Sequence, residues 1–192
     1  RLGQIYFDRG DETNVIRVWE PGLELEPNHP QKQYHLASIF EERDQREKAI
    51  KHFGLANEYD PSHYDWHFRY ARLLDRHALT VEDYHVYAGM AVEEYGKTIG
   101  LEPTYAPSFF FRGLITRRYR QIGKILHRSS KIAEDFKQVI TLQPKNADAH
   151  YYLAMTELDL DNRYKAKEFF EKTLSIQPEY NGVNVELGAI IE

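Results

Sequence analysis

Nine histidines give this 192-residue chain its most visible capacity for chemistry. His63 and His67 are four residues apart, so on a helix their imidazoles would share one face, and Asp65 lies between them in sequence. Two imidazoles and a carboxylate are ligands that zinc accepts. The His-Glu-x-x-His pattern of zinc proteases is absent, however, and Pro61 makes this segment the first turn of a helix. We therefore expect surface histidines here and no metal site.

Residue types that catalyse reactions form no known catalytic pattern in this sequence. The chain has no cysteine, which excludes disulfides, thiolate metal sites and a cysteine nucleophile. The G-x-S-x-G nucleophile motif, phosphate loops and dinucleotide fingerprints are also missing. Glu41 and Glu42 are adjacent, as are Glu93 and Glu94, and adjacent side chains diverge on a helix. The sequence predicts neither an enzyme nor a cofactor.

Positive charge is concentrated in one stretch of an acidic chain. Residues 103–133 contain no Asp or Glu. Since the net charge is −5 and this stretch contributes +7, the remainder carries −12. Such a surface could attract an acidic peptide, nucleic acid or anionic lipid; alternatively, it is a solvated helix face partly neutralised by acidic residues within 82–94. The basic residues are Arg112, Arg117, Arg118, Arg120, Lys124, Arg128 and Lys131.

The elements that must position these side chains are clearest in residues 146–180. Apolar and small residues recur there at helical spacing on either side of residues 160–163, which contain the Asp and Asn that favour a turn. Pro178 ends the second of the two segments, because proline lacks an N–H group. The stretch predicts a helical hairpin whose small residues allow close approach. The recurring residues are Leu153, Ala154, Ala166, Phe170 and Thr173.

Comparable hairpins precede four other prolines, at spacings of 34, 42, 41 and 34 residues along the chain. This pattern resembles the tetratricopeptide repeat, whose W-x2-L-G-x2-Y, A-x3-F and P positions recur every 34 residues. The resemblance covers essentially the whole chain. It implies an all-α fold in which tandem hairpins stack into a right-handed superhelix. The five prolines are Pro27, Pro61, Pro103, Pro144 and Pro178.

The prolines divide the chain into a single array of six repeats, of which the last is a partial, capping unit. The first is also partial; the chain starts inside its first helix, which suggests a fragment or a trimmed chain. In its second helix, Pro21 predicts a kink or early fraying. The expected repeats are 1–29, 30–63, 64–105, 106–146, 147–180 and 181–192.

Residues 64–105 and 106–146 exceed the 34-residue period by 8 and 7 residues, about two helical turns each. With Thr80 as the residue that caps it, the second helix of 64–105 is expected to run over 81–99. The first helix of 106–146 is expected over 107–127. We expect these two elongated helices to form a spur that extends about 11 Å beyond the body and bears Arg120, Lys124, Arg128 and Lys131.

The resemblance implies that the first helix of each repeat lines a concave inner wall. Aromatic residues and arginines dominate binding hot spots, so their mixture here suggests a groove for an extended peptide or a helix. Alternatively, several of the aromatics only pack between helices. The expected partner-binding residues are Tyr34, His35, Phe68, Arg69, Arg72, Arg76, Phe110, Phe111, Arg117, Arg118, Tyr151, Tyr152 and Met155.

One well-known ligand of this family is not expected. The two-carboxylate clamp that binds chaperone tails needs Lys and Asn where this chain has Tyr34 and Ser38 in one repeat and Phe68 and Arg72 in the next. The resulting expectation is a protein–protein interaction scaffold that binds a partner's peptide or helix, with arginines contacting acidic groups.

Other roles remain open at this point. Alternatives are a structural adaptor that forms homo-oligomers through its end helices, and binding of an anionic ligand or RNA by the spur. The negative net charge argues against general nucleic-acid binding. No run approaches the ~20 apolar residues of a membrane span. The lack of cysteine fits the bacterial periplasm or cell envelope, with the cytoplasm as the alternative.

Overall fold

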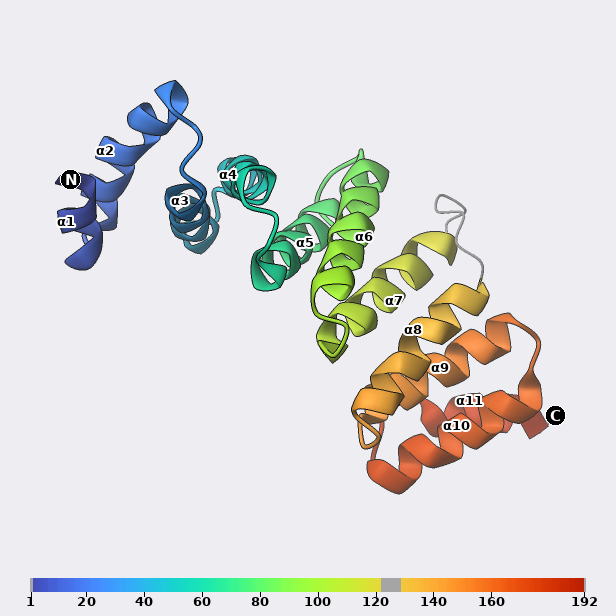
Figure 1. The fold of residues 1–192 in the computed structure, drawn as a ribbon. Helices are drawn as coiled ribbons and strands as arrows, with labels where there is room; N and C mark the ends of the chain where they lie inside the picture. Colours follow the sequence, from blue (N-terminus) through green and yellow to red (C-terminus); the bar gives the residue numbers. More distant parts are fainter. Residues whose placement is uncertain (1, 122–128, 192) are drawn as a thin grey trace. The chain divides into compact units, whose positions relative to one another are not determined.

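The structure is a computed structural model that describes residues 2–121 and 129–191, and within these residues it contains eleven helices and no strand (Figure 1). Consecutive helices fold back on each other as hairpins (Figure 1). The prediction of an all-α chain of tandem hairpins is therefore confirmed. The chain forms two compact units, Arg1–Leu101 and Glu102–Glu192, called here the N-terminal and the C-terminal unit.

The N-terminal unit contains three hairpins, each made of a first and a second helix that pack against each other. Both helices supply the core: in the middle hairpin Leu36 and Ala37 come from the first helix, and Ala49 and Phe53 come from the second. The helices are α1 (Leu2–Asp8), α2 (Glu12–Leu25), α3 (Pro30–Glu42), α4 (Arg46–Tyr59), α5 (Tyr64–Ala78) and α6 (Tyr84–Leu101).

The C-terminal unit contains two hairpins and one further first helix. One buried cluster joins Phe136 to Leu153, and a second joins Phe170 to Val183. The second cluster reaches the last helix, which therefore packs on the hairpin before it. The helices are α7 (Ala106–Gln121), α8 (Ser129–Leu142), α9 (Ala147–Asp159), α10 (Arg163–Ile176) and α11 (Val183–Ile191).

Small residues stand where the two helices of a hairpin come closest. A Cβ atom at Gly113 of α7 would lie 2.9 Å from the Phe136 ring of α8, closer than the ~3.5 Å at which carbon atoms attract each other. Ala154 of α9 and Ala166 of α10 are fully buried in one cluster. A larger side chain at these places would push the helices apart, as the sequence predicts for the two alanines.

Three of the turns inside hairpins share one backbone conformation. Two residues before the second helix begins, the chain adopts positive φ at Gly10 (70°), Asp44 (56°) and Asp161 (61°). Glycine does this without strain, and aspartate tolerates it better than most residues. The next residue is the N-cap, and in α2 the Asp11 carboxylate accepts a hydrogen bond from the Asn14 N–H (3.2 Å).

Two local expectations need correction. α2 continues through Pro21 to Leu25, so the early fraying does not occur, whereas the kink stays a prediction. α6 begins at Tyr84 rather than at residue 81, because the Thr80 hydroxyl donates to the His77 carbonyl (2.8 Å) at the end of α5 instead of capping α6.

The two helices expected to be elongated have 18 (α6) and 16 (α7) residues, the longest among the described helices. Residues 122–127, the expected continuation of α7 and of the spur, lie outside the described residues. The division into six repeats stays a prediction. Within 2–121 and 129–191, no helix has both the length and the hydropathy that crossing a membrane requires.

The positive φ at Asp161 leads to the first prediction. Asp161→Ala should lower the free energy of unfolding of the C-terminal unit by about 1 kcal/mol, because alanine is strained in the left-handed region. Asp161→Gly is the matched control and should cost less than about 0.5 kcal/mol, since it loses the same carboxylate without that strain. Urea denaturation followed by circular dichroism measures both. Equal losses for the two variants would contradict the assignment.

Candidate functional site

A side-chain hydrogen bond fixes the start of three first helices. In each case a buried residue on the helix contacts the carbonyl oxygen of the proline six residues earlier, and we call this contact the proline latch. It ties the chain that leaves one hairpin to the helix that opens the next. The first helix α7 has Phe109 at the equivalent place and cannot form it. The pairs are Gln33 Nε2 with Pro27 (3.0 Å), His67 Nε2 with Pro61 (3.2 Å) and His150 Nε2 with Pro144 (3.0 Å).

The prediction of surface histidines is wrong for His67, which is only 2% exposed. Its Nε2 contacts the Pro61 carbonyl, and its Nδ1 lies 2.5 Å from Oε2 of Glu94. Each ring nitrogen of His67 therefore lies within hydrogen-bond distance of an oxygen atom, and the ring is held between the end of one hairpin and α6. Burial opposes ionisation of Glu94, but hydrogen bonds from His67 and Lys97 hold the pKa of Glu94 below its usual value.

His63 also has a structural role. Its ring stacks on Trp66 at a centroid distance of 4.0 Å, and its Nε2 lies 3.2 Å from Oδ2 of Asp60. His63 and His67 thus bind different partners instead of sharing a metal ion. In the part of the chain that the structure describes, no three His, Asp or Glu side chains gather in a way that could hold a metal ion.

The first-helix face of the N-terminal unit is built on stacked rings. Tyr34 of α3 stacks on Trp66 of α5, with ring centroids 4.7 Å apart and planes inclined by 16°. The guanidinium of Arg69 lies 5.7 Å from the centroid of Tyr34 and 5.4 Å from that of Phe53. Contacts of this kind are attractive. Tyr34 and Arg69, both expected to bind a partner, therefore also connect neighbouring repeats.

The arginines of this face are already engaged with carboxylates. Arg69 donates from Nε to Oε2 of Glu41 (2.8 Å), and Arg76 donates to the other oxygen of the same carboxylate. Arg72 lies 3.9 Å from Asp75. No sequence pattern indicates that one glutamate of α3 serves two arginines of α5. An acidic ligand would have to compete with Glu41.

The two other expected residues of the N-terminal unit pack on apolar rings. His35 lies 4.4 Å from Phe7 of α1, centroid to centroid, and burial lowers the pKa of His35, which favours the neutral ring. Phe68 lies 5.9 Å from Tyr95 of α6. Both are half-buried, so each also keeps part of its surface outside the core.

The first-helix face of the C-terminal unit is mostly aromatic. Phe110 of α7 meets Phe136 of α8 and Tyr152 of α9 edge to face, at centroid distances of 6.0 and 5.9 Å. Phe111 meets Phe110 in the same manner at 5.5 Å. The expectation that several aromatics pack between helices therefore holds for Phe110 and Tyr152, although both remain half-buried rather than buried.

Tyr151 and Met155 lie one turn apart on α9 and continue this face toward α11. Tyr151 packs 4.9 Å from Tyr180, ring to ring, and burial raises its pKa. Met155 packs on the cluster that contains Ala154 and Phe170. Like Phe110, both side chains are half-buried.

An ion pair links the ends of neighbouring first helices in each unit, with opposite polarity. In the C-terminal unit Arg117, the twelfth residue of α7, lies 3.3 Å from Asp159, the thirteenth of α9. In the N-terminal unit the same two places hold Glu41 on α3 and Arg76 on α5. Neighbouring first helices therefore keep the same register in both units.

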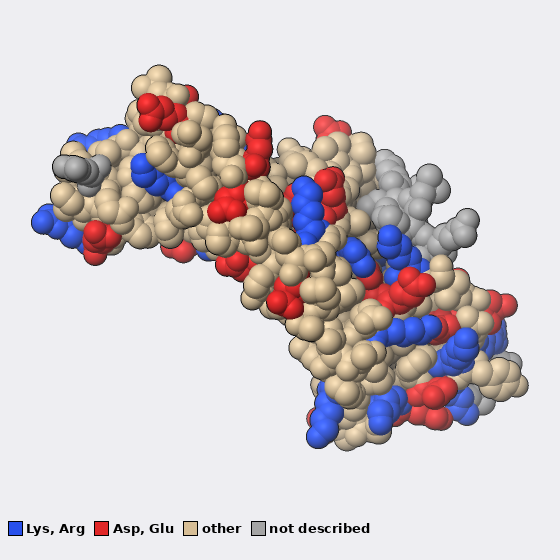
Figure 2. All heavy atoms as spheres, viewed as in Figure 1, with Lys and Arg blue, Asp and Glu red and all other residues tan. Residues whose placement is uncertain are grey.

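The basic stretch is partly neutralised inside its own unit. Arg112 makes a two-pronged contact with Asp135 of α8 (3.0 and 2.5 Å), and Arg117 pairs with Asp159. Burial raises the pKa of Asp135, although Arg112 opposes this shift. Figure 2 shows Lys and Arg side chains interleaved with Asp and Glu over the visible face of the C-terminal unit.

The remaining basic residues do not make up a described site. Arg118 and Lys131 are exposed, and the Arg118 guanidinium lies 6.0 Å from the Tyr119 ring centroid. Lys124 and Arg128 lie outside the described residues, as does the side chain of Arg120. The expected basic spur therefore stays a prediction.

The proline latch at His150 can be tested by two substitutions. His150→Leu should lower the free energy of unfolding by about 1–2 kcal/mol, because the partly buried hydrogen bond to the Pro144 carbonyl is lost. His150→Gln is the matched control: Gln33 shows that an amide can make the same hydrogen bond, so its loss should be less than about 1 kcal/mol. Urea midpoints compare the two, and a glutamine variant as unstable as the leucine variant would contradict the latch.

A pH dependence follows from His52, which is buried against Gln33 with its Nδ1 2.6 Å from Oε1. Burial lowers its pKa from 6.5 to about 4. The unfolded chain then binds the proton more readily, so the stability that neutral His52 provides is present above pH 6.5 and is lost as the pH falls toward 4. At pH 5 the loss should be about 2 kcal/mol. In urea titrations, the difference in the free energy of unfolding between pH 7.5 and pH 5 should be smaller by this amount in the His52→Gln variant. An unchanged difference would exclude His52 as its source.

Comparisons with known proteins agree with this architecture. Residues 147–180 match the sequence model of the tetratricopeptide repeat. No curated protein matches the chain in sequence. Among solved structures, MamA is 17% identical, with 93% of this chain and 96% of MamA covered at a TM-score of 0.68. YrrB, described as a tetratricopeptide-repeat protein with an unusual peptide-binding site, is 16% identical, with 97% and 88% covered at 0.75.

A third structure, a thermophilic tetratricopeptide-repeat protein of Thermus thermophilus, is 19% identical, with 100% of this chain and 96% of that protein covered at 0.58. At such identities the similarity concerns the fold alone. The family resemblance predicted from the prolines and small residues is confirmed: residues 147–180 are a tetratricopeptide repeat, and the chain has the tetratricopeptide-repeat fold.

Proposed function

We propose that this chain is a protein–protein interaction scaffold that binds a segment of a partner protein. The segment would lie on the side of the first helices that faces away from the buried core. Tetratricopeptide-repeat proteins are in general non-enzymatic scaffolds, and YrrB, which shares the fold, is described with a peptide-binding site. In the C-terminal unit the proposed binding face is formed by α7 and α9. An extended peptide or an amphipathic helix would both suit such a face.

The observation that carries the proposal is a group of apolar side chains that the C-terminal unit does not bury fully. Ile115 of α7 and Leu153 of α9 point into the core and are 0% exposed, whereas the members of this group keep part of their surface outside it. Aromatic residues and methionine are enriched at protein interfaces. The group consists of Phe110, Phe111, Leu114, Tyr151, Tyr152 and Met155.

The face of α3 and α5 has a different character. Arg69 and Arg76 both contact Glu41, and Arg72 lies 3.9 Å from Asp75. The Arg76 side chain is 49% exposed, so a ligand carboxylate can reach it. We therefore propose that this face prefers a partner segment with acidic residues. The preference should be moderate, because the ligand replaces contacts that Glu41 already makes.

A selection from displayed random peptides of about 12 residues tests the proposal on the α7–α9 face. Selected peptides should carry aromatic or aliphatic anchors. Tyr151→Ala combined with Met155→Ala should weaken the best peptide at least tenfold, because these side chains provide the anchor surface. Tyr59→Ala, which removes an exposed tyrosine from α4, is the control and should leave the affinity unchanged. Fluorescence anisotropy measures both.

The contrary results are equally clear. Unchanged affinity in the Tyr151 and Met155 double variant, with an unchanged urea midpoint, would exclude the α7–α9 face as the binding site. For the α3–α5 face, Arg72→Glu combined with Arg76→Glu should reduce binding of acidic peptides and spare neutral ones. Equal effects on both peptide classes would contradict the acidic preference.

A further inference from the structure

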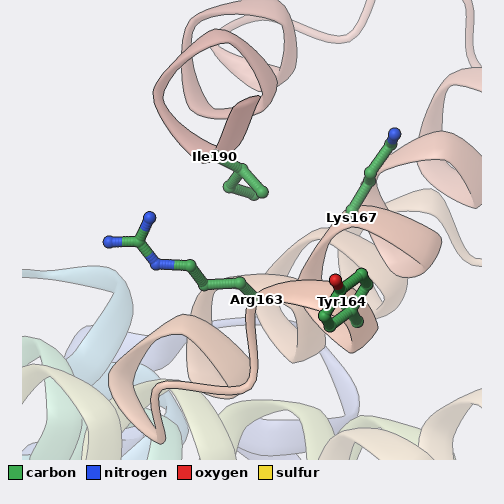
Figure 3. A pocket seen from close by; sticks show the side chains of 4 residues that line it. All are labelled: Arg163, Tyr164, Lys167 and Ile190. Atoms are coloured by element: carbon green, nitrogen blue, oxygen red, sulfur yellow. The ribbon is translucent and has the colours of Figure 1, made fainter. Parts of the chain in front are cut away.

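A cleft of about 320 Å³ lies between α10 and α11 (Figure 3). Ile190 points into it from α11, and Arg163, Tyr164 and Lys167 line it from α10. Tyr164 is 93% exposed, an extreme value for so large a ring. The cleft thus combines an aliphatic and an aromatic side chain with two cations, which is a suitable environment for an apolar side chain with acidic neighbours.

The two cations of this cleft each have one acidic neighbour and stay accessible to a ligand. Arg163 lies 4.0 Å from Asp161 and Lys167 lies 3.9 Å from Glu171, both at the limit of ion pairing. The two basic side chains are 62% and 45% exposed. The first turn of α10 contains no acidic residue, and the N-terminus of a helix carries a partial positive charge that adds to the two cations.

A complementary surface exists at the end of α2. Leu25, its last residue, is 85% exposed, the highest value for a large aliphatic side chain among the described residues. Glu24 and Glu26 flank it and are exposed as well. The C-terminus of a helix carries a partial negative charge. We call Leu25 with Glu24 and Glu26 the α2 tip. Its leucine matches the apolar side chains of the α10–α11 cleft, its glutamates match the two cations, and its helix C-terminus matches the N-terminus of α10.

We propose that a second copy of this chain occupies the cleft. Leu25 of one molecule inserts between Tyr164 and Ile190 of the next, and Glu24 and Glu26 face its Arg163 and Lys167. The two surfaces differ, so the contact is head-to-tail, and a pair of molecules keeps one free cleft and one free α2 tip. Because the cleft is small, the association is weak, as expected for an interface of limited area. Because charged side chains contribute to it, the association also depends on salt. This contact goes beyond the proposed function and does not rest on it.

Sedimentation velocity of the full chain between about 1 µM and 1 mM tests the contact. The weight-average sedimentation coefficient should rise with concentration and fall when the ionic strength is raised from about 0.05 M to about 0.5 M. Leu25→Ser should weaken association about tenfold, whereas Leu79→Ser, an exposed leucine at the end of α5, should not.

Charge reversal provides a sharper test that a folding defect cannot imitate. One variant carries Arg163→Glu and Lys167→Glu, and the other carries Glu24→Lys and Glu26→Lys. Each alone should associate at least tenfold more weakly than the unaltered chain, because cleft and tip then have the same sign. Mixed in equal amounts, each variant presents the tip that suits the other's cleft, so association should return to within about threefold of the original.

Three results would overturn the proposal: a sedimentation coefficient that does not change with concentration at low salt, association that Leu25→Ser leaves intact, or two charge-reversed variants that remain monomeric when mixed. A chain that stays monomeric but binds an acidic peptide from another protein at Tyr164 would likewise show that the occupant is not a second copy. Circular dichroism of each variant confirms that the compared chains are folded.

Discussion

The hydrogen bond between a first helix and the proline carbonyl six residues before it is the contact on which the arrangement of this protein depends. The proline ends one hairpin, and its carbonyl is partly shielded from water by the next helix, so a protein donor stabilises it. Gln33, His67 and His150 provide that donor from the first turn of the next helix. Each such contact sets where the helix begins and therefore which of its side chains face outward.

In the N-terminal unit α3 and α5 both begin with such a contact, and Glu41 and Arg76 meet near the ends of these two helices. Arg117 and Asp159 occupy the same places on α7 and α9, although only α9 has the contact, so packing against α8 must also hold the register of α7. The register also brings aromatic rings together nearer the helix starts, as in the stack of Tyr34 on Trp66. The proposed surface for a partner thus includes residues that also hold neighbouring first helices together.

The hairpins could be predicted because they depend on local signals, namely proline stops and small residues at helical spacing. The side-chain partners could not, because they join residues far apart in the chain. His67 reads as a surface histidine until Glu94 is placed beside it, and Arg69 reads as a free cation until Glu41 is known to lie near. Threonine often caps the start of a helix, but the Thr80 hydroxyl donates to the His77 carbonyl at the end of the preceding helix. Residue type alone does not decide between these two nearby partners.

The distribution of tryptophan has a practical consequence. Trp19 and Trp66 are the two tryptophans of the chain, both are buried, and both belong to the N-terminal unit. Indole emission therefore reports the melting of that unit alone, whereas the far-ultraviolet signal comes from helices of both. Coincident transitions would mean that the two halves unfold as one cooperative body, and separated ones that each half melts independently.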